Sequence, residues 1–188
     1  MRGKLIFITG GIRSGKSSWA ERIVADMGQR VTYIATARVL DEEMGRRVEL
    51  HRLHRPEGWL TIEEPLKVSQ VVSKFSDKSD VIMIDCLTIL LSNLMLEAEN
   101  GGERVKSELQ QDILDEITSL AGMARDAKAH VVIVSNEVGM SLVSENFLGR
   151  QFQDLAGLAN QIVAGLADEA YFVVAGYPID LKRGRGGK

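Results

Sequence analysis

The stretch that decides the fold is Gly10-Gly-Ile-Arg-Ser-Gly-Lys-Ser17. It has the spacing of a P-loop, in which glycines let the backbone wrap around phosphate oxygens and a lysine reaches the β- and γ-phosphates. The apolar run Leu5–Thr9 before it predicts a buried strand, and the amphipathic run Ser17–Met27 after it predicts a helix. Because a helix N-terminus attracts anions, this context predicts a site for ATP or GTP. We expect nine residues to hold the nucleotide: Gly10, Gly11, Ile12, Arg13, Ser14, Gly15, Lys16, Ser17 and Ser18.

Outside this stretch, short apolar runs alternate with longer amphipathic ones. The apolar runs predict further buried strands at Val31–Ala35, Val81–Asp85, Val131–Ser135 and Tyr171–Ala175. The amphipathic runs predict helices at Glu42–Arg52, Leu66–Phe75, Thr88–Glu97, Glu103–Ala127 and Asn146–Ala167. This alternation predicts an α/β fold, with a mostly parallel sheet and helices on both faces. We expect one domain over residues 1–181 and a flexible, glycine-rich tail over residues 182–188.

Composition and charge favour a small-molecule substrate. The chain has 188 residues, a net charge of −3 and a pI of about 5.7, so it has no basic field for nucleic acid or an anionic membrane. Its single cysteine, Cys86, has no partner for an internal disulfide, which is typical of a reducing cytoplasm. The apolar stretch Leu87–Leu96 is too short for a membrane span. We therefore expect a cytoplasmic protein without a membrane span or a nucleic-acid partner.

A second feature typical of P-loop proteins is the third predicted strand, with the residue that ends it. Val81-Ile-Met-Ile-Asp85 is an apolar run that ends in a carboxylate, the arrangement by which P-loop proteins hold Mg²⁺ from a neighbouring strand. The alternative is a strand that simply ends in a solvated aspartate. Beside a P-loop we favour the metal role, with Ser17 and Asp85 as the protein ligands of Mg²⁺.

Several segments together resemble one known family. They occur in order from about residue 5 to about residue 176, and they are the P-loop, Tyr33-Ile-Ala-Thr-Ala37, Asp41-Glu-Glu-Met44, Arg47-Val-Glu-Leu-His51, Arg55-Pro56, Ser135-Asn-Glu-Val-Gly139, Asp154 to Gln161, and Val174-Ala-Gly176. This pattern resembles the bifunctional adenosylcobinamide kinases/adenosylcobinamide-phosphate guanylyltransferases. The resemblance implies a single-domain P-loop NTPase of the RecA-like type.

The resemblance also implies two reactions in the assembly of the coenzyme B12 nucleotide loop. A nucleoside triphosphate phosphorylates the aminopropanol hydroxyl of adenosylcobinamide. A histidine then takes GMP from GTP and passes it to adenosylcobinamide phosphate, which gives adenosyl-GDP-cobinamide. Lys16 and His51 would be the catalytic residues. On the substrate or guanine side the resemblance implies five further residues: Thr36, Arg47, Glu63, Asn136 and Glu137.

Two points stay open in the sequence. The motif places the guanylylated histidine at His51, but His54 is three residues away and would share the same helix face; we interpret His130, at the start of a strand, as structural. The alternatives to the bifunctional enzyme are a P-loop kinase for another small hydroxyl substrate, in which His51 is dispensable, and a RecA-like ATPase module. The resemblance implies a small homo-oligomer, specifically a homotrimer.

Overall fold

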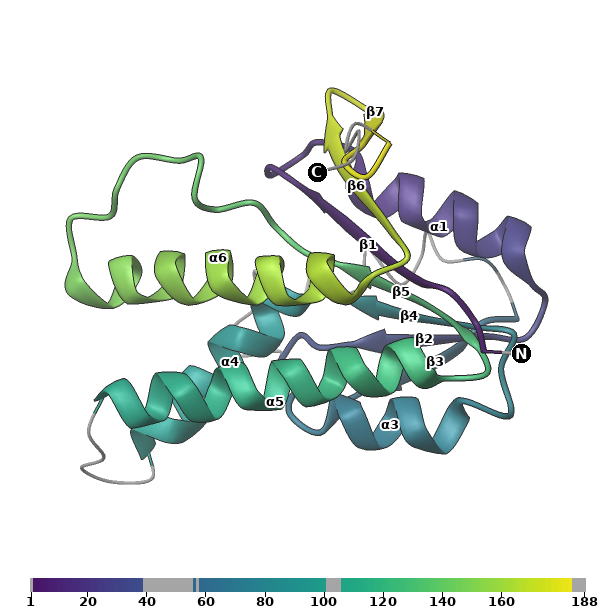
Figure 1. Cartoon of the computed structure of the whole chain (residues 1–188), viewed down its shortest axis with the longest axis horizontal. Coiled ribbons are helices and arrows are strands. Elements are labelled where there is room, and N and C mark those ends of the chain that lie inside the picture. The colour runs from purple at the N-terminus through teal and green to yellow at the C-terminus, as the bar shows by residue number, and fades with distance from the viewer. Residues whose placement is uncertain (1, 39–55, 57, 101–105, 184–188) are drawn as a thin grey trace.

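A seven-stranded sheet organises the chain. The computed structural model describes residues 2–38, 56, 58–100 and 106–183. The strand order is β3-β2-β4-β5-β1-β6-β7, and all neighbouring strands are parallel except β6 and β7, which form an antiparallel hairpin (Figure 1). The strands are β1 (Leu5–Gly10), β2 (Val31–Ala35), β3 (Leu60–Glu63), β4 (Val81–Asp85), β5 (His130–Val134), β6 (Glu169–Val174) and β7 (Tyr177–Asp180).

Helices cover both faces of the sheet, as the sequence predicts. α1 packs on one face, while α3, α5 and α6 pack on the other together with the first turns of α4 (Figure 1). The sequence of β1 is continuously apolar because both faces of this strand are buried. Successive strand residues point to opposite faces, so Leu5 and Phe7 enter the core under α5 and α6, whereas Ile6 and Ile8 enter the core under α1. The helices are α1 (Lys16–Met27), α3 (Val68–Phe75), α4 (Leu87–Asn100), α5 (Lys106–Asp126) and α6 (Phe147–Leu166).

The predicted elements agree with the described ones to within a few residues. β2 and β4 have the predicted bounds, and α3 begins at Val68, two residues later than predicted, because the Glu64 carboxylate accepts the N–H groups of Leu66 and Lys67 in the preceding turn. The helix predicted at Glu42–Arg52 lies outside the described residues.

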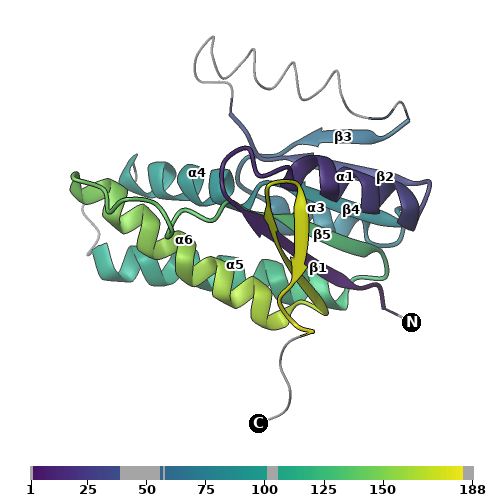
Figure 2. The same ribbon diagram turned by 90° about the horizontal axis from the view of Figure 1, so that it is seen from above.

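Two strands were not predicted, and both are short strands at the edges of the sheet. β3 and the C-terminal hairpin lie at opposite edges (Figure 2). β3 is half-buried or exposed along its length. β7 contains Pro178. An edge strand tolerates proline because it pairs on one side only, so the position without an N–H can face solvent. Edge strands bury little surface, so they lack the continuous apolar run that identifies the central strands.

The two ends of the described chain are tied to the sheet. Lys182 and Arg183, which open the predicted flexible tail, donate their backbone N–H groups to the Asp180 carboxylate; residues 184–188 lie outside the described part. At the other end, Arg2 donates two hydrogen bonds to Asp168, at 2.6 and 2.8 Å, and the Leu5 N–H donates a third. Asp168 thus holds the residues before β1 against the start of β6.

This contact predicts a pH-dependent loss of stability in Asp168→Asn. The Arg2 guanidinium holds the pKa of Asp168 at about 2, below its ordinary value of 3.8, so the contact stabilises the fold above about pH 4 and is lost as the pH falls through about 2. We expect the substitution to lower the free energy of unfolding by about 1–2 kcal/mol at pH 7, because Arg2 is partly exposed. Urea denaturation at pH 7 and near pH 2.5 measures this.

The matched control is Asp77→Asn, which removes an ion pair with Lys128 in which both side chains are exposed. We expect it to cost no more than about 0.5 kcal/mol. An Asp168→Asn deficit that is equally large at both pH values would contradict the electrostatic origin of the effect.

No helix within residues 2–38, 58–100 and 106–183 combines the length and the apolar character that a bilayer crossing requires.

Candidate nucleotide site

The P-loop connects the end of β1 to the start of α1, as predicted. The Ser14 N–H donates to the Gly11 carbonyl across the loop, and Gly15, with φ of 90°, is the residue before the helix. This left-handed conformation suits glycine, because a Cβ there would meet the backbone oxygen. Arg13 also has a positive φ, of 57°, and its side chain is exposed. The two positive φ angles and the hydrogen bond between Ser14 and Gly11 thus define the turn that leads from β1 into α1.

Position 10 requires glycine because the backbone of β6 lies very close to it. A Cβ at this position would lie 2.4 Å from the Val173 carbonyl oxygen of β6 and 2.7 Å from Ser14 Oγ. Gly10 pairs directly with Val173 in the parallel ladder, so neither backbone can move away without disturbing the sheet. The first glycine of the motif thus lets the loop begin while β1 is still paired with its neighbour.

Lys16 is the first residue of α1, and its side chain reaches back to the loop. Its side chain is 9% exposed, and its Nζ donates to the Gly11 carbonyl oxygen at 3.2 Å. Burial lowers the pKa of Lys16, while the nearby Cys86 and Asp85 act in the opposite direction. A phosphate would supply the negative charge that this buried ammonium lacks, so the arrangement favours an anionic ligand.

Ser14 supports the same conclusion. Its Oγ is buried and has no hydrogen-bond partner among the described residues, as is also true of Thr9 Oγ1 below it. Buried hydroxyls are normally hydrogen-bonded, so an unpaired one inside this loop is suited to donate to a phosphate oxygen. Ser17 and Ser18 occupy the first turn of α1, whereas Ile12 is 86% exposed and contributes its backbone alone to the loop.

Asp85 ends β4 at the same edge of the sheet, but not on the strand next to β1. β5 lies between β1 and β4, so the expectation of a neighbouring strand is wrong. The separation by one strand follows from the parallel crossovers, whose order a sequence does not reveal. The Tyr33 hydroxyl donates to Asp85 Oδ2 at 2.6 Å, and this bond orients the carboxylate. Asp85 acts to raise the pKa of Lys16, against the lowering caused by burial.

The residues present fit a magnesium ion. Mg²⁺ is usually bound by one or two protein oxygens together with phosphate oxygens and water. Ser17 supplies a hydroxyl and Asp85 a carboxylate, of which Tyr33 occupies one oxygen. Within the described ranges there is no cluster of three or more histidine, cysteine, aspartate or glutamate side chains that could form an all-protein metal site. The donor set therefore suits a metal shared with a nucleotide.

Thr36 lies at the end of β2 and has a structural role in the described chain. Its side chain is fully buried; the hydroxyl donates to the Cys86 carbonyl and accepts the Cys86 N–H, both at 2.9 Å. Asn93 of α4 donates to the Thr36 carbonyl at 2.7 Å. The donor of the Thr36 hydroxyl and one of its two acceptor positions are thus used to hold the segment after β4. The place of Thr36 on the substrate or guanine side stays a prediction.

Asn136 and Glu137 follow β5, which pairs with β1. The Asn136 Nδ2 donates to Thr88 Oγ1 at 3.2 Å, and the Glu137 N–H donates to the Gly10 carbonyl at 3.0 Å. The segment after β5 is thus attached to the P-loop itself. Both residues lie at the carboxyl edge of the sheet, where ligands of open α/β sheets bind.

The remaining predicted residues lie farther away or outside the described part. Glu63 ends β3 at the same edge, but four strands from β1, which is about 19 Å at the usual strand spacing. Arg47, His51 and His54 lie outside the described residues. His130 has the predicted structural role, since its Nδ1 accepts the Lys4 N–H at 3.0 Å.

Gly176 is a site residue to which no role had been assigned. It forms the β6–β7 turn with Ala175, and its N–H donates to the Ser14 carbonyl of the P-loop at 2.8 Å. A Cβ on Gly15 would lie 3.1 Å from the Gly176 Cα, so the two glycines allow the hairpin to pack on the loop. In the sequence, Val174-Ala-Gly176 belongs to the family pattern without a role of its own. Only the fold shows that this turn is hydrogen-bonded to the P-loop.

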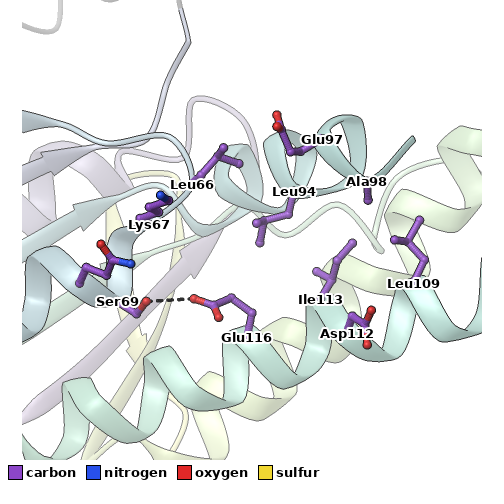
Figure 3. A pocket seen from close by; sticks show the side chains of 11 residues that line it. Leu66, Lys67, Ser69, Leu94, Glu97, Ala98, Leu109, Asp112, Ile113 and Glu116 are labelled. Atoms are coloured by element: carbon purple, nitrogen blue, oxygen red, sulfur yellow. Dashed lines mark hydrogen bonds between the residues drawn. The ribbon is translucent and has the colours of Figure 1, made fainter. Parts of the chain in front are cut away.

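A cavity of 420 Å³ lies elsewhere, between α3, α4 and α5 (Figure 3). Leu94 and Ile113 form part of its apolar wall, and Asp112 and Glu116 lie at its rim, where Ser69 donates to Glu116. It contains none of the predicted site residues and no cation apart from Lys67. The phosphate site, by contrast, is an open loop at the sheet edge.

The fold and this loop define the protein as an α/β P-loop protein with a mostly parallel sheet. The structure is similar to the assembled ATPase EscN of the enteropathogenic E. coli type III secretion system, with a TM-score of 0.57 over 92% of this chain and 43% of that one. The two sequences are 15% identical, so this likeness concerns the fold alone.

Sequence comparison identifies the family. Residues 6–181 match the family described as cobinamide kinase / cobinamide phosphate guanyltransferase. The chain is 39% identical to the bifunctional adenosylcobalamin biosynthesis protein CobU of Escherichia coli (strain K12), over 95% of this chain and 99% of that protein. It is 40% identical to the CobU protein of Salmonella typhimurium (strain LT2), over the same shares of the two chains. The chain therefore belongs to the cobinamide kinase / cobinamide phosphate guanyltransferase family.

Proposed function

We propose that the protein carries out both reactions of its family: phosphorylation of adenosylcobinamide by ATP or GTP, and transfer of GMP from GTP to adenosylcobinamide phosphate. The observation that carries the proposal is the complete P-loop in a chain that matches the family from residue 6 to residue 181. The buried Lys16 ammonium and the unpaired Ser14 hydroxyl support a triphosphate as the ligand.

The kinase step depends mainly on positioning and on charge. Lys16 and the N–H groups at the start of α1 face the phosphates and compensate the charge that develops as the γ-phosphoryl group is transferred. Ser17 and Asp85 would hold Mg²⁺, which neutralises phosphate charge when it is bound. Tyr33 orients Asp85, and Gly176 supports the loop from the side of β6. The protein thus provides a preformed cradle rather than a covalent intermediate for this step.

The guanylyl step needs a nucleophile, for which we propose His51. A neutral imidazole attacks the α-phosphate through the nitrogen that carries no proton, a bond to GMP forms, and pyrophosphate leaves. The phosphate of adenosylcobinamide phosphate then takes GMP from the histidine. His54 is the alternative, since it lies three residues away in the sequence. Arg47 and Glu63 remain predicted residues of the guanine side.

Covalent labelling tests this proposal directly. We expect the purified protein, incubated with Mg²⁺ and GTP labelled on the α-phosphate and then denatured, to retain label that is acid-labile and alkali-stable, as a phosphoramidate is. His51→Ala should abolish the label and retain phosphorylation of adenosylcobinamide, because the kinase step uses no histidine. His54→Ala is the matched control and should label like the unchanged protein.

The other outcomes are informative. Label lost in His54→Ala but kept in His51→Ala would move the nucleophile to His54. A protein that binds GTP and phosphorylates adenosylcobinamide but never labels would be a kinase only. Nucleotide hydrolysis without phosphorylation of adenosylcobinamide would instead support an ATPase module.

The assembly and location of the protein complete the proposal. We propose a homotrimer in the cytoplasm, on the basis of the family membership and the predicted absence of disulfides. Sedimentation equilibrium of the purified protein measures the assembly, and a monomeric or dimeric mass would contradict the trimer.

A further inference from the structure

Transfer of a phosphoryl group to a hydroxyl releases a proton, and a nearby base speeds the transfer by accepting it. Cys86, which follows Asp85, is enclosed by the protein. Its side chain is buried, and its Sγ contacts the Thr88 hydroxyl at 3.2 Å. The thiol therefore does not face the space where an acceptor hydroxyl would bind.

The described carboxylates at this edge of the sheet differ in their position relative to the P-loop. Asp85 ends β4, accepts the Tyr33 hydroxyl and is the proposed metal ligand. Glu63 ends β3, four strands from β1, and Glu64 follows it directly. Glu137 follows β5, which pairs with β1. Among these described carboxylates, Glu137 is therefore the candidate beside the P-loop that is not already proposed as a metal ligand.

Glu137 lies beside the P-loop. It follows β5, the strand that separates β1 from β4, and its N–H donates to the Gly10 carbonyl at the first residue of the loop. Its Oε1 accepts the Gly139 N–H at 3.0 Å, which holds the carboxylate in a short turn. Oε2 has no hydrogen-bond partner among the described residues, and Glu137 is half-buried. One oxygen is thus anchored and the other is available.

The backbone that carries Glu137 is held firmly. The Ser135 N–H donates to the Ile8 carbonyl of β1, and the buried Ser135 hydroxyl donates to Asn160 Oδ1 at 2.6 Å. Asn160, from α6, in turn donates to the Asn136 carbonyl at 3.2 Å. A carboxylate on a support of this kind keeps its position relative to the phosphates, which is what a catalytic base requires.

We propose that Glu137 is the base of the kinase step, an inference that rests on the proposed function. The acceptor hydroxyl gives its proton to the Glu137 carboxylate as its oxygen bonds to the γ-phosphorus. The bond between that phosphorus and the β,γ-bridging oxygen breaks, and the nucleoside diphosphate leaves with the electron pair. Glu137 releases the proton to solvent after the products dissociate. The guanylyl step requires no such base, because its nucleophiles are a neutral imidazole and an ionised phosphate.

Glu137→Gln tests this role, because the amide keeps the shape of the side chain and cannot accept the proton. We expect kcat for phosphorylation of adenosylcobinamide to fall about 100-fold or more, with KM for the triphosphate changed less than about threefold. Labelling by GTP, and GMP transfer to adenosylcobinamide phosphate supplied as substrate, should stay within about threefold of the unchanged protein. Glu145→Gln, an exposed change of equal charge in the same loop, is the matched control for the kinase step.

Two results with Glu137→Gln would overturn its role as the base, and one result with the unchanged protein would contradict the proposed function. Kinase activity of Glu137→Gln within about threefold of the unchanged protein would overturn the proposal. Equal losses of phosphorylation, labelling and nucleotide binding would also overturn it, because they would show that Glu137 only maintains the loop. Failure of the unchanged protein to phosphorylate adenosylcobinamide would be seen before any variant is compared, and it would contradict the proposed function instead.

Discussion

Lys16→Met should lower kcat/KM for phosphorylation of adenosylcobinamide by about 10³-fold, which corresponds to about 4 kcal/mol of transition-state stabilisation. Lys16 is largely buried, and its ammonium donates to the Gly11 carbonyl at 3.2 Å, with no carboxylate in contact among the described residues. It is therefore held in the loop and poorly compensated until phosphates bind. We expect labelling by GTP to fall as well, since both reactions are proposed to use this loop.

The stability of Lys16→Met separates a loss of function from a loss of fold. Methionine keeps most of the side-chain volume and removes a buried charge, so the free energy of unfolding should stay the same or rise. Lys16→Arg keeps the charge but places a planar, larger group in the loop, and we expect it to remain impaired. Steady-state kinetics with denaturant unfolding measures both. Near-normal kinase activity in Lys16→Met would contradict the assignment of the phosphate site.

Gly10→Ala should weaken triphosphate binding by about 100-fold and lower the free energy of unfolding by about 2–3 kcal/mol. The added Cβ would lie 2.4 Å from the Val173 carbonyl oxygen, a contact that only a shift of β1 against β6 can relieve. That shift would also move the start of the P-loop. Calorimetric titration with a non-hydrolysable triphosphate and urea denaturation measure the two effects.

Gly11→Ala is the matched control for stability, since a Cβ there meets nothing within 4 Å. We expect its free energy of unfolding to remain within about 0.5 kcal/mol of the unchanged protein. Equal destabilisation by the two substitutions would mean that the loop as a whole, and not the contact with Val173, imposes glycine at position 10.

Much of the fold followed from local pattern. The P-loop between Leu5–Gly10 and Lys16–Met27 was predictable because its spacing and its flanking periodicities are short-range features. The central strands were predictable because burial on both faces demands continuous apolar runs. The family resemblance also depended on segments read in order along the chain, and the match over residues 6–181 confirms it.

Edge strands and helix starts were less predictable. β3 and β7 bury little, so their sequences resemble loops. Glu64 delays α3 through two hydrogen bonds that no periodicity reveals. Thr36 bonds through its hydroxyl to the backbone of Cys86, a residue 50 positions away, and no local pattern reveals this contact.

By itself, the sequence determined the class of the protein: an α/β chain with a phosphate-binding loop, a carboxylate at the end of a strand, and the ordered motifs of one family. Only the tertiary structure decided which of these groups meet. The strand order placed β5 between β1 and β4, which brought Glu137 to Gly10 and set Asp85 one strand farther away. The physical reason is that motif spacing reflects local backbone geometry, whereas contacts between distant segments depend on how parallel strands are ordered and packed.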